Sequence, residues 1–167
     1  LAVDLDLFAR CAQFLHHAVE RRCKKADLVA PIERCVHVEV PLRYLVRAIE
    51  ECPAPVIAMI EGGVWGGACE VAFACDLIVA APDATFAVTP AKLGVPYNVS
   101  GMLTFLNATS MRIVKEMAFT AMPVGAERAE RLGMINYVVP AEDLERFPVA
   151  LAADIAANAP LSLSVMK

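Results

Sequence analysis

Residues 55–80, PVIAMIEGGVWGGACEVAFACDLIVA, contain four of the chain's eight glycines within six successive positions. The apolar residues 56–60 before the glycines predict a strand, and residues 68–74 after them predict a short helix. Glycine is costly in ordered backbone unless the chain needs a positive φ or a close approach to another group. Backbone N–H groups at a helix start, aided by the helix dipole, also attract a negatively charged oxygen. The stretch therefore predicts either a tight strand-to-helix turn or an oxyanion site, and the residues alone favour neither.

The spacing of these glycines removes the usual support for nucleotide binding. It matches neither Gly-x-Gly-x-x-Gly nor a phosphate loop that ends in Gly-Lys-Ser or Gly-Lys-Thr. The net charge of −4 gives the chain no general attraction to nucleic acid. No apolar run approaches the ~20 residues that a bilayer-spanning helix requires. We therefore expect a cytoplasmic protein that binds neither nucleic acid nor a membrane.

The composition indicates a folded domain rather than a disordered chain. Of the 167 residues, 58% are hydrophobic and 20% are charged, which allows one domain with a sizeable core. So apolar a chain also suggests that part of its surface is buried between subunits. The six cysteines form no Cys-x-x-Cys pair, and Cys35-x-His37 lacks the second ligand pair of a zinc site. We therefore expect reduced thiols and no bound metal.

The apolar pattern alternates between helical and strand periods along the chain. Val36, Val38 and Val40 alternate with polar residues, as in a strand. The further predicted strands are residues 56–60, 77–80, 85–88 and 135–139. The predicted helices are residues 42–49, 68–74, 102–108, 111–119, 126–132 and 142–158, the last with a break or restart at Pro148. Strands that alternate with helices indicate an α/β protein.

The glycine-rich stretch resembles the central segment of the crotonase, or enoyl-CoA hydratase/isomerase, superfamily. Later motifs extend the resemblance over about residues 41–167, namely Thr85-Phe86, residues 89–97, residues 126–133 and Val138-Val139. Within the superfamily, residues 64–67, VWGG, and residues 93–98, LGVPYN, are most similar to the methylmalonyl-CoA decarboxylases. The resemblance implies an α/β fold in which ββα turns stack into a spiral.

The resemblance also implies a division of the chain. Residues 41–167 are interpreted as the crotonase-like core, and residues 1–40 as a divergent or mis-assigned segment. Compared with the superfamily, we expect part of the amino-terminal turns and the carboxy-terminal helices to be missing. Residues 1–61 contain no glycine, so the earlier loop that supplies a second oxyanion donor in the family is not recognised.

The resemblance implies a role for residues around the glycine loop. In the family, two backbone N–H groups stabilise a thioester enolate, and Gly67 matches one of these donors. Glu70 matches the first of two glutamates that the hydratases use, whereas Ala91 occupies the position of the second. Tyr97 matches a family tyrosine that we expect to hold a substrate carboxylate. The expected substrate-binding residues are Gly63, Val64, Trp65, Gly66, Val95, Pro96 and Asn98.

Three of these residues have structural alternatives. Tyr97 could be a partly buried tyrosine whose hydroxyl lies at the surface. Glu70 could accept hydrogen bonds near the helix start, and Asn98 could cap the helix that follows it. The residues themselves leave these alternatives open.

A single glutamate favours decarboxylation over hydration. Loss of CO2 from a malonyl-type thioester forms an enolate without a strong base, so we expect methylmalonyl-CoA, or a similar thioester, to give propionyl-CoA and CO2. Coenzyme A is part of this substrate, and we expect no separate cofactor. A complete fold would form a homotrimer or hexamer. Two alternatives stay open, an enoyl-CoA hydratase or isomerase that uses Glu70 and an inactive subunit that binds CoA esters.

Overall fold

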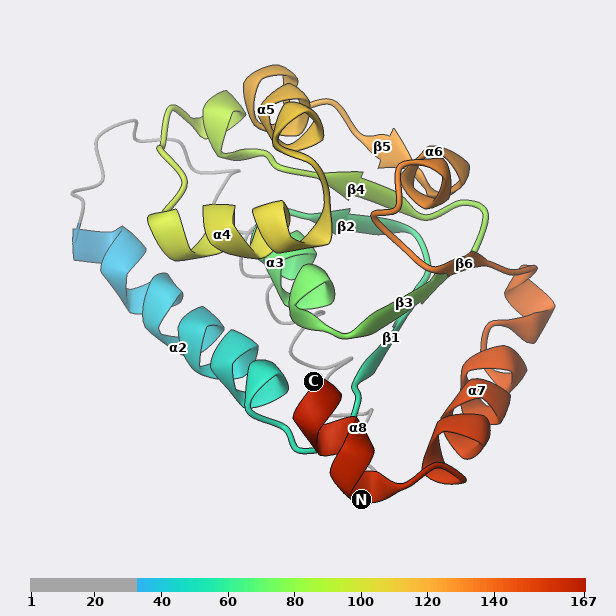
Figure 1. Cartoon of the computed structure of the whole chain (residues 1–167). Helices are drawn as coiled ribbons and strands as arrows, with labels where there is room; N and C mark the ends of the chain where they lie inside the picture. Colours follow the sequence, from blue (N-terminus) through green and yellow to red (C-terminus); the bar gives the residue numbers. More distant parts are fainter. Residues whose placement is uncertain (1–32) are drawn as a thin grey trace. The chain divides into compact units, whose positions relative to one another are not determined.

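Figure 1 shows the computed structural model, which describes residues 33–167, with side chains from Leu42 onward. Contacts within the chain divide it into two units, Leu1–Pro41 and Leu42–Lys167. The site described below belongs to the second unit. Most of the predicted segment 1–40, and the side chains of Cys35 and His37, lie outside the described residues.

Helices and short strands alternate along the described chain, which confirms the α/β prediction. The helices are α2 (Glu33–Glu50), α3 (Gly67–Ala74), α4 (Val99–Ala108), α5 (Met111–Thr120), α6 (Ala126–Arg131), α7 (Arg146–Ala156) and α8 (Pro160–Met166). The strands are β1 (Ile57–Ile60), β2 (Gly63–Trp65), β3 (Leu77–Ala80), β4 (Thr85–Ala87), β5 (Val124–Gly125) and β6 (Tyr137–Val138). Two 3-10 turns, η1 (Pro90–Leu93) and η2 (Ala141–Asp143), precede α4 and α7.

The described strands form two small sheets that the chain enters in turn. One sheet has the order β1-β3-β6 and is parallel throughout. The other has the order β2-β4-β5, with β2 parallel to β4 and β5 antiparallel to β4. The pair β1 and β2 therefore lies beside the pair β3 and β4, with Ile57 opposite Leu77 and Gly63 opposite Thr85. This repeated step is the stacked ββα arrangement that the resemblance implied.

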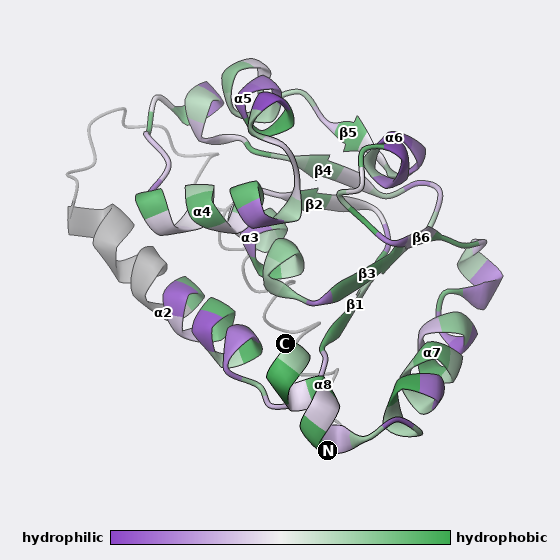
Figure 2. Cartoon of the chain, viewed as in Figure 1, coloured by the Kyte–Doolittle hydropathy of each residue, from purple (hydrophilic) through white to green (hydrophobic). Residues whose placement is uncertain are grey.

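Aromatic rings from three elements form the centre of the core. Phe73 of α3 stacks on Phe86 of β4 and meets Phe105 of α4 edge-on, each at a centroid distance of 5.7 Å. Phe86 and Phe105 are fully buried, and each such side chain stabilises the fold by about 1.5–3 kcal/mol relative to an exposed position. Figure 2 shows the same segregation, with hydrophobic residues concentrated along β1 and β3 and hydrophilic ones on α6. The aromatic cluster thus packs α3 against β4 and α4.

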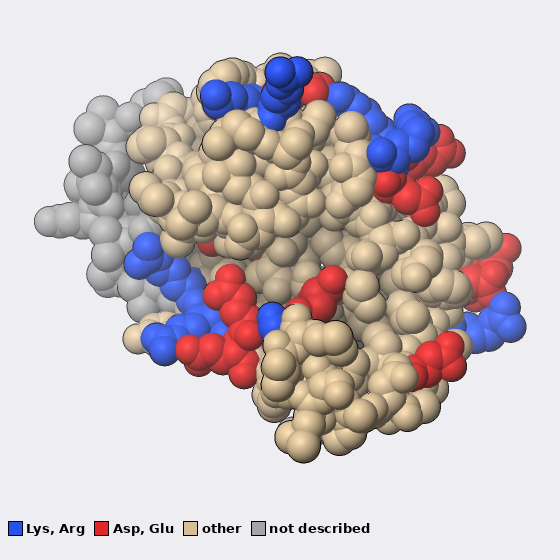
Figure 3. Space-filling model, in the orientation of Figure 1, with Lys and Arg blue, Asp and Glu red and all other residues tan. Residues whose placement is uncertain are grey.

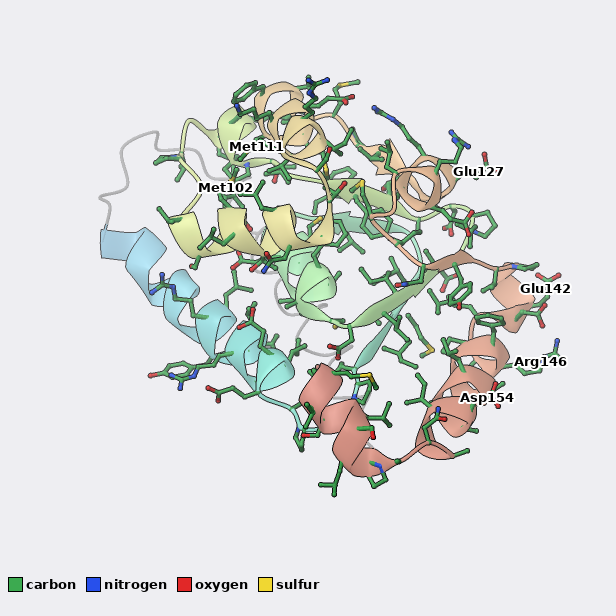
Figure 4. All side chains as sticks on the ribbon, in the orientation of Figure 1. Met102, Met111, Glu127, Glu142, Arg146 and Asp154 are labelled. Carbon is green, nitrogen blue, oxygen red and sulfur yellow. The ribbon has the colours of Figure 1, made fainter. Side chains whose placement is uncertain are left out.

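Charged residues on the later helices face away from this core. Figure 4 shows Glu127, Arg146 and Asp154 pointing outward from α6 and α7. Within the described residues, no single helix is both long enough and apolar enough to cross a membrane. Helices α7 and α8 together reach that length and apolar composition, but the chain bends by 108° between them.

Lys167 connects three segments of the described unit. Its Nζ lies 2.8 Å from Asp76 Oδ2 and donates to the carbonyl oxygens of Ile49 and Ala54 at 3.0 and 3.1 Å. Asp76 Oδ2 also accepts a hydrogen bond of 2.6 Å from the backbone N–H of Val56. The side chains of Lys167 and Asp76 are 10% and 28% exposed, so this ion pair is partly shielded from water. They fix the end of α2 and the turn after α3 against the start of β1.

Two predicted elements differ from the observed ones. The strand predicted at Val36, Val38 and Val40 is wrong, because these residues lie in α2. Val36 and Val40 are four positions apart and so share a helix face as well as a strand face. The break or restart predicted at Pro148 occurs two residues earlier, because α7 begins at Arg146 after the 3-10 turn η2. Pro148 is the third residue of α7, where a helix has no intrahelical acceptor for an N–H group.

Candidate active site

The glycine loop presents a backbone amide at the start of α3. The Gly66 N–H donates to Ala87 O at 2.8 Å, and Gly66 O accepts from the N–H groups of Cys69 and Glu70 at 3.1 and 3.3 Å. Within the described residues, the N–H of Gly67 donates to no backbone carbonyl. It is the first helical N–H, which has no partner inside the helix. Within the described residues, the loop therefore offers the N–H of Gly67, followed by that of Ala68, as donors at the positive end of the α3 dipole.

Neighbouring side chains crowd the loop at Gly66 and Gly67. A Cβ on Gly67 would lie 3.1 Å from Leu42 Cδ2, and a Cβ on Gly66 would lie 3.3 Å from Thr89 Oγ1. Gly66 also has a φ of 60° and a ψ of −124°, a combination that is essentially restricted to glycine. At these two positions a side chain would therefore crowd Leu42 or Thr89.

Tyr97 and Glu70 form a hydrogen-bonded pair beside this loop. Tyr97 Oη lies 2.7 Å from Glu70 Oε2 and 3.5 Å from Gly66 O. The Tyr97 ring packs edge-on against Phe105 at 5.2 Å, and Glu70 is only 1% exposed. The phenol hydroxyl is therefore held next to the loop that carries the Gly67 amide.

Gly101 and Asn98 fix this pair from α4. A Cβ on Gly101 would overlap the Tyr97 ring and lie 2.6 Å from Glu70 Oε2. The side-chain oxygen of Asn98 caps α4, since it accepts from Gly101 N and Ser100 Oγ at 2.7 Å each. Sequence reasoning named Asn98 both as a helix cap and as a substrate-binding residue, and the cap is what its contacts show. Gly101 was missed, although a glycine inside a predicted helix is a signal of close packing.

The residues predicted to bind substrate from β2 lie on its two sides. Gly63 and Trp65 share one face of the strand and Val64 points to the other. The Trp65 indole donates to Thr85 Oγ1 at 3.2 Å and remains 53% exposed. It lies over Gly63, where a Cβ would approach the indole nitrogen to 3.3 Å.

The remaining predicted contacts belong to the segment between η1 and α4. Val95 and Pro96 are exposed there, and Ala91 is an exposed residue of η1. The described structure thus brings Gly66, Gly67 and Tyr97 together with Glu70. Within residues 42–167, neither Val95 nor Pro96 forms a hydrogen bond with that group, and the Val95 N–H donates to Pro90 O at 3.2 Å instead.

A cavity of about 510 Å³ lies between α2 and α4. Figure 3 shows Lys or Arg and Asp or Glu side chains gathered along the edge of the molecule beside it. Arg47 pairs with Glu51 at 2.7 Å, and Arg43 donates to Ser100 Oγ at 3.1 Å. The buried carboxyl of Glu70 also lines this cavity. Its other lining residues include Val46, Glu50, Leu103, Thr104 and Asn107.

The cysteines of the site are not suited to nucleophilic chemistry. Burial raises the pKa of the Cys69 thiol far above its usual range, and burial raises the pKa of Cys75 to about 12. Both thiols are therefore protonated near neutral pH, whereas the thiolate is the reactive form. In residues 42–167, no three His, Cys, Asp or Glu side chains gather as a metal ion would require.

Most of the described chain is similar in sequence to known proteins. A family model described as enoyl-CoA hydratase/isomerase matches residues 35–167. Methylmalonyl-CoA decarboxylase of Escherichia coli K12 is 46% identical over 76% of this chain and 49% of its own length. Short-chain-enoyl-CoA hydratase of Clostridium acetobutylicum is 32% identical over 72% of this chain and 46% of its own length.

Solved structures of related proteins are similar to this chain in fold as well as in sequence. A methylmalonyl-CoA decarboxylase in complex with 2S-carboxypropyl-CoA superposes with a TM-score of 0.74 at 46% identity. The match covers 75% of this chain and 48% of that one. The chain thus spans about half the length of the curated relatives it matches.

Proposed function

The chain belongs to the enoyl-CoA hydratase/isomerase family, and from that membership we propose that it decarboxylates a malonyl-type CoA thioester. The expected reaction converts methylmalonyl-CoA to propionyl-CoA and CO2. The resemblance of the glycine loop to the crotonase superfamily is confirmed by the family match. One observation carries the choice of reaction, namely a Gly67 amide without a backbone acceptor in the described residues, next to the hydroxyl of Tyr97.

Decarboxylation uses the amide at the position where charge develops. When the bond between C2 and the carboxylate breaks, its electron pair moves into the thioester carbonyl and forms an enolate oxygen. A preorganised N–H donor stabilises that oxygen more than the ground-state carbonyl, and loss of one such donor typically costs about 2.7–4 kcal/mol of barrier. A proton then adds to C2 and completes propionyl-CoA. Gly67 is our candidate for the donor.

The carboxylate that leaves must be held perpendicular to the thioester plane. A hydroxyl beside the amide suits this positioning task, and Tyr97 is our candidate because its Oη lies 3.5 Å from Gly66 O. Relatives of this chain include a methylmalonyl-CoA decarboxylase whose structure contains 2S-carboxypropyl-CoA, a ligand that carries such a carboxylate. This supports a carboxylate-bearing acyl-CoA as the substrate class.

Hydration or isomerisation by Glu70 is the second candidate. It is favoured by the buried Glu70 carboxyl and by the 32% identity to an enoyl-CoA hydratase. Against it stands Ala91, which has no acid–base group where the hydratases have their second glutamate.

Product analysis separates these candidates. The chain is incubated with methylmalonyl-CoA and, separately, with crotonyl-CoA, and the thioesters are identified by mass spectrometry. Propionyl-CoA with released CO2 supports the proposal, whereas 3-hydroxybutyryl-CoA from crotonyl-CoA supports the alternative. Binding of either thioester without any product would indicate an inactive CoA-ester-binding subunit and would contradict both.

A further inference from the structure

We propose that Arg43 of α2 is a positioning residue for the phenol of Tyr97. Its guanidinium acts through hydrogen bonds that run along the first turn of α4, from Ser100 to Asn98 and the Gly101 N–H. These bonds are called the hydrogen-bond relay below. Arg43 and Ser100 are 57 positions apart in the sequence, so the relay joins two separate helices. This inference rests on the proposed function, because it concerns the hydroxyl that we expect to hold the substrate carboxylate.

The chemistry of the four groups fixes the direction of each hydrogen bond. The Gly101 N–H lies 2.7 Å from Asn98 Oδ1 and can only donate to it. Ser100 Oγ is also 2.7 Å from this oxygen, so the serine hydroxyl donates its one proton there. A guanidinium has no acceptor, so Arg43 Nη2 donates to Ser100 Oγ across 3.1 Å. The hydroxyl therefore accepts from Arg43 and donates to Asn98.

The positive charge at one end strengthens the bonds that follow it. A charged donor forms a stronger hydrogen bond than a neutral one. A hydroxyl that accepts such a bond becomes a better donor, because neighbouring hydrogen bonds polarise one another. Arg43 thus stabilises the rotamer in which Asn98 accepts from both Ser100 and Gly101. This rotamer is the one that caps α4.

The capped turn carries the phenol. Tyr97 directly precedes the cap residue, so the backbone angles of Asn98, φ −70° and ψ 156°, set the direction in which Tyr97 leaves α4. The Gly101 N–H donates to the Asn98 side chain, and a Cβ on Gly101 would overlap the Tyr97 ring. A weaker cap therefore changes both the backbone next to the tyrosine and the surface on which its ring lies.

Other contacts of the same ring limit the size of this effect. Tyr97 also packs on Phe105 and lies within hydrogen-bond distance of Glu70. We therefore expect loss of the relay to shift the phenol by a fraction of its own length, without releasing it from the site. Such a shift matters for catalysis, because a misplacement of about 1 Å can lower a rate by about 100-fold.

Arg47 provides a matched control one turn further along α2. It is exposed like Arg43 and lines the same cavity. Its Nε, however, pairs with Glu51 of the same segment at 2.7 Å. Replacement of Arg47 removes an equal charge from the same helix but leaves the relay intact.

Nuclear magnetic resonance measures the relay without any turnover. Arg43→Met keeps a long side chain but removes the donor. We expect the Gly101 amide proton to move upfield, because its hydrogen bond to Asn98 weakens, and the Tyr97 ring signals to shift with it. Arg43→Lys, which keeps a charged donor, should restore most of both shifts. Arg47→Met should leave both signals in place.

The same spectra can overturn the inference. Unchanged Gly101 and Tyr97 signals in Arg43→Met would do so, and so would equal shifts in Arg47→Met. Circular dichroism and urea midpoints check that these variants are folded to the same extent. If the wild type releases no CO2 from methylmalonyl-CoA, the proposed reaction fails, whereas the spectra still decide whether Arg43 positions the tyrosine.

A double-mutant cycle tests whether Arg43 acts through Ser100. Ser100→Ala interrupts the relay and should lower kcat for methylmalonyl-CoA by about tenfold, through the shifted phenol. Arg43→Met should lower kcat by a similar or smaller factor. The double variant should be no slower than Ser100→Ala, because residues of one network are not additive. Losses that multiply in the double variant, or an Arg47→Met loss equal to that of Arg43→Met, would contradict the inference.

Discussion

Two segments that lead into helices meet at the candidate site, and they contribute different chemistry. Residues 62–67 lead into α3 and offer a backbone N–H, which needs no side chain at position 67. Residues 94–101 lead into α4 and contribute the hydroxyl of Tyr97, which is held by Asn98, Gly101 and the Glu70 contact. The first segment is anchored by the aromatic core, whereas the second is largely exposed until Tyr97.

The backbone donor and the side-chain donor are therefore lost through different kinds of substitution. A backbone donor is lost only when the loop moves, so its integrity depends on the packing of α3 and on the bonds around Lys167. A side-chain donor can be removed by one substitution that leaves the fold intact. Variants of the two segments should therefore split into those that change turnover and those that change the free energy of unfolding.

Tyr97→Phe should have the largest effect on turnover. It removes the hydroxyl but keeps the ring that packs on Phe105, so we expect decarboxylation to fall by about 100-fold or more. The free energy of unfolding should fall by only about 1 kcal/mol, the worth of one hydrogen bond. Rates of CO2 release and urea unfolding measure the two quantities.

The control for this variant is Tyr137→Phe, on β6 and packed against Phe147. It makes the same chemical change away from the loop and should leave turnover within about twofold. Full turnover by Tyr97→Phe would remove the hydroxyl from the mechanism.

Gly101→Ala should change both quantities. The new methyl group would overlap the Tyr97 ring and Glu70 Oε2, and overpacking of this kind costs about 1–3 kcal/mol. The displaced phenol should also lower decarboxylation by about tenfold or more.

Gly125→Ala is the matched control, because nothing lies within 4 Å of a Cβ at Gly125 and its φ is −72°. We expect its unfolding free energy to change by less than about 1 kcal/mol. Equal effects of the two alanines would show that position 101 is not specially crowded.

Lys167→Met should affect the first segment through stability alone. It breaks the contact with Asp76 and leaves the carbonyls of Ile49 and Ala54 without this donor. We expect the free energy of unfolding to fall by about 1–3 kcal/mol. Lys115→Met, an exposed position on α5, should change it by less than about 0.5 kcal/mol. Equal urea midpoints for the Lys167→Met and Lys115→Met variants would contradict this expectation.

The smallest effect concerns the thiol inside α3. Because burial raises the pKa of Cys69, almost no thiolate exists at pH 8, and raising the pH to 9 should still leave it unmodified. Half-buried Cys52 should be alkylated first among Cys52, Cys69 and Cys75. Peptide mapping after iodoacetamide treatment measures this order. Early labelling of Cys69 would show that α3 opens readily.

The sequence predicted the elements around the first segment well, because their signals are local, but it missed strand β2, which lies at Gly63–Trp65 inside the predicted glycine loop. The strand at residues 77–80 coincides with β3, and the helix expected from Ala68 begins one residue earlier, at Gly67. A continuous apolar run and a glycine cluster each report their own backbone conformation. The α/β class and the stacked ββα turns followed from these elements and from the family resemblance.

The second segment and the start of α2 were harder, because their determinants are contacts distant in sequence. Glu70 and Tyr97 are 27 positions apart, so no pattern in either neighbourhood reports their hydrogen bond. The crowding at Gly101 involves the same two residues. The valines at positions 36–40 fit a strand or a helix by spacing alone, and the helix that continues to Glu50 decides between them.

The central claim is that the Gly67 amide donates to a negatively charged oxygen of the bound thioester. Its most direct test is the ¹H–¹⁵N spectrum of the chain titrated with 2-nitronate-propionyl-CoA, the ligand bound by a related decarboxylase. We predict that the Gly67 amide proton shows the largest downfield shift in the spectrum, because it gains a charge-assisted hydrogen bond. Saturable binding that leaves the Gly67 resonance unmoved would contradict the account.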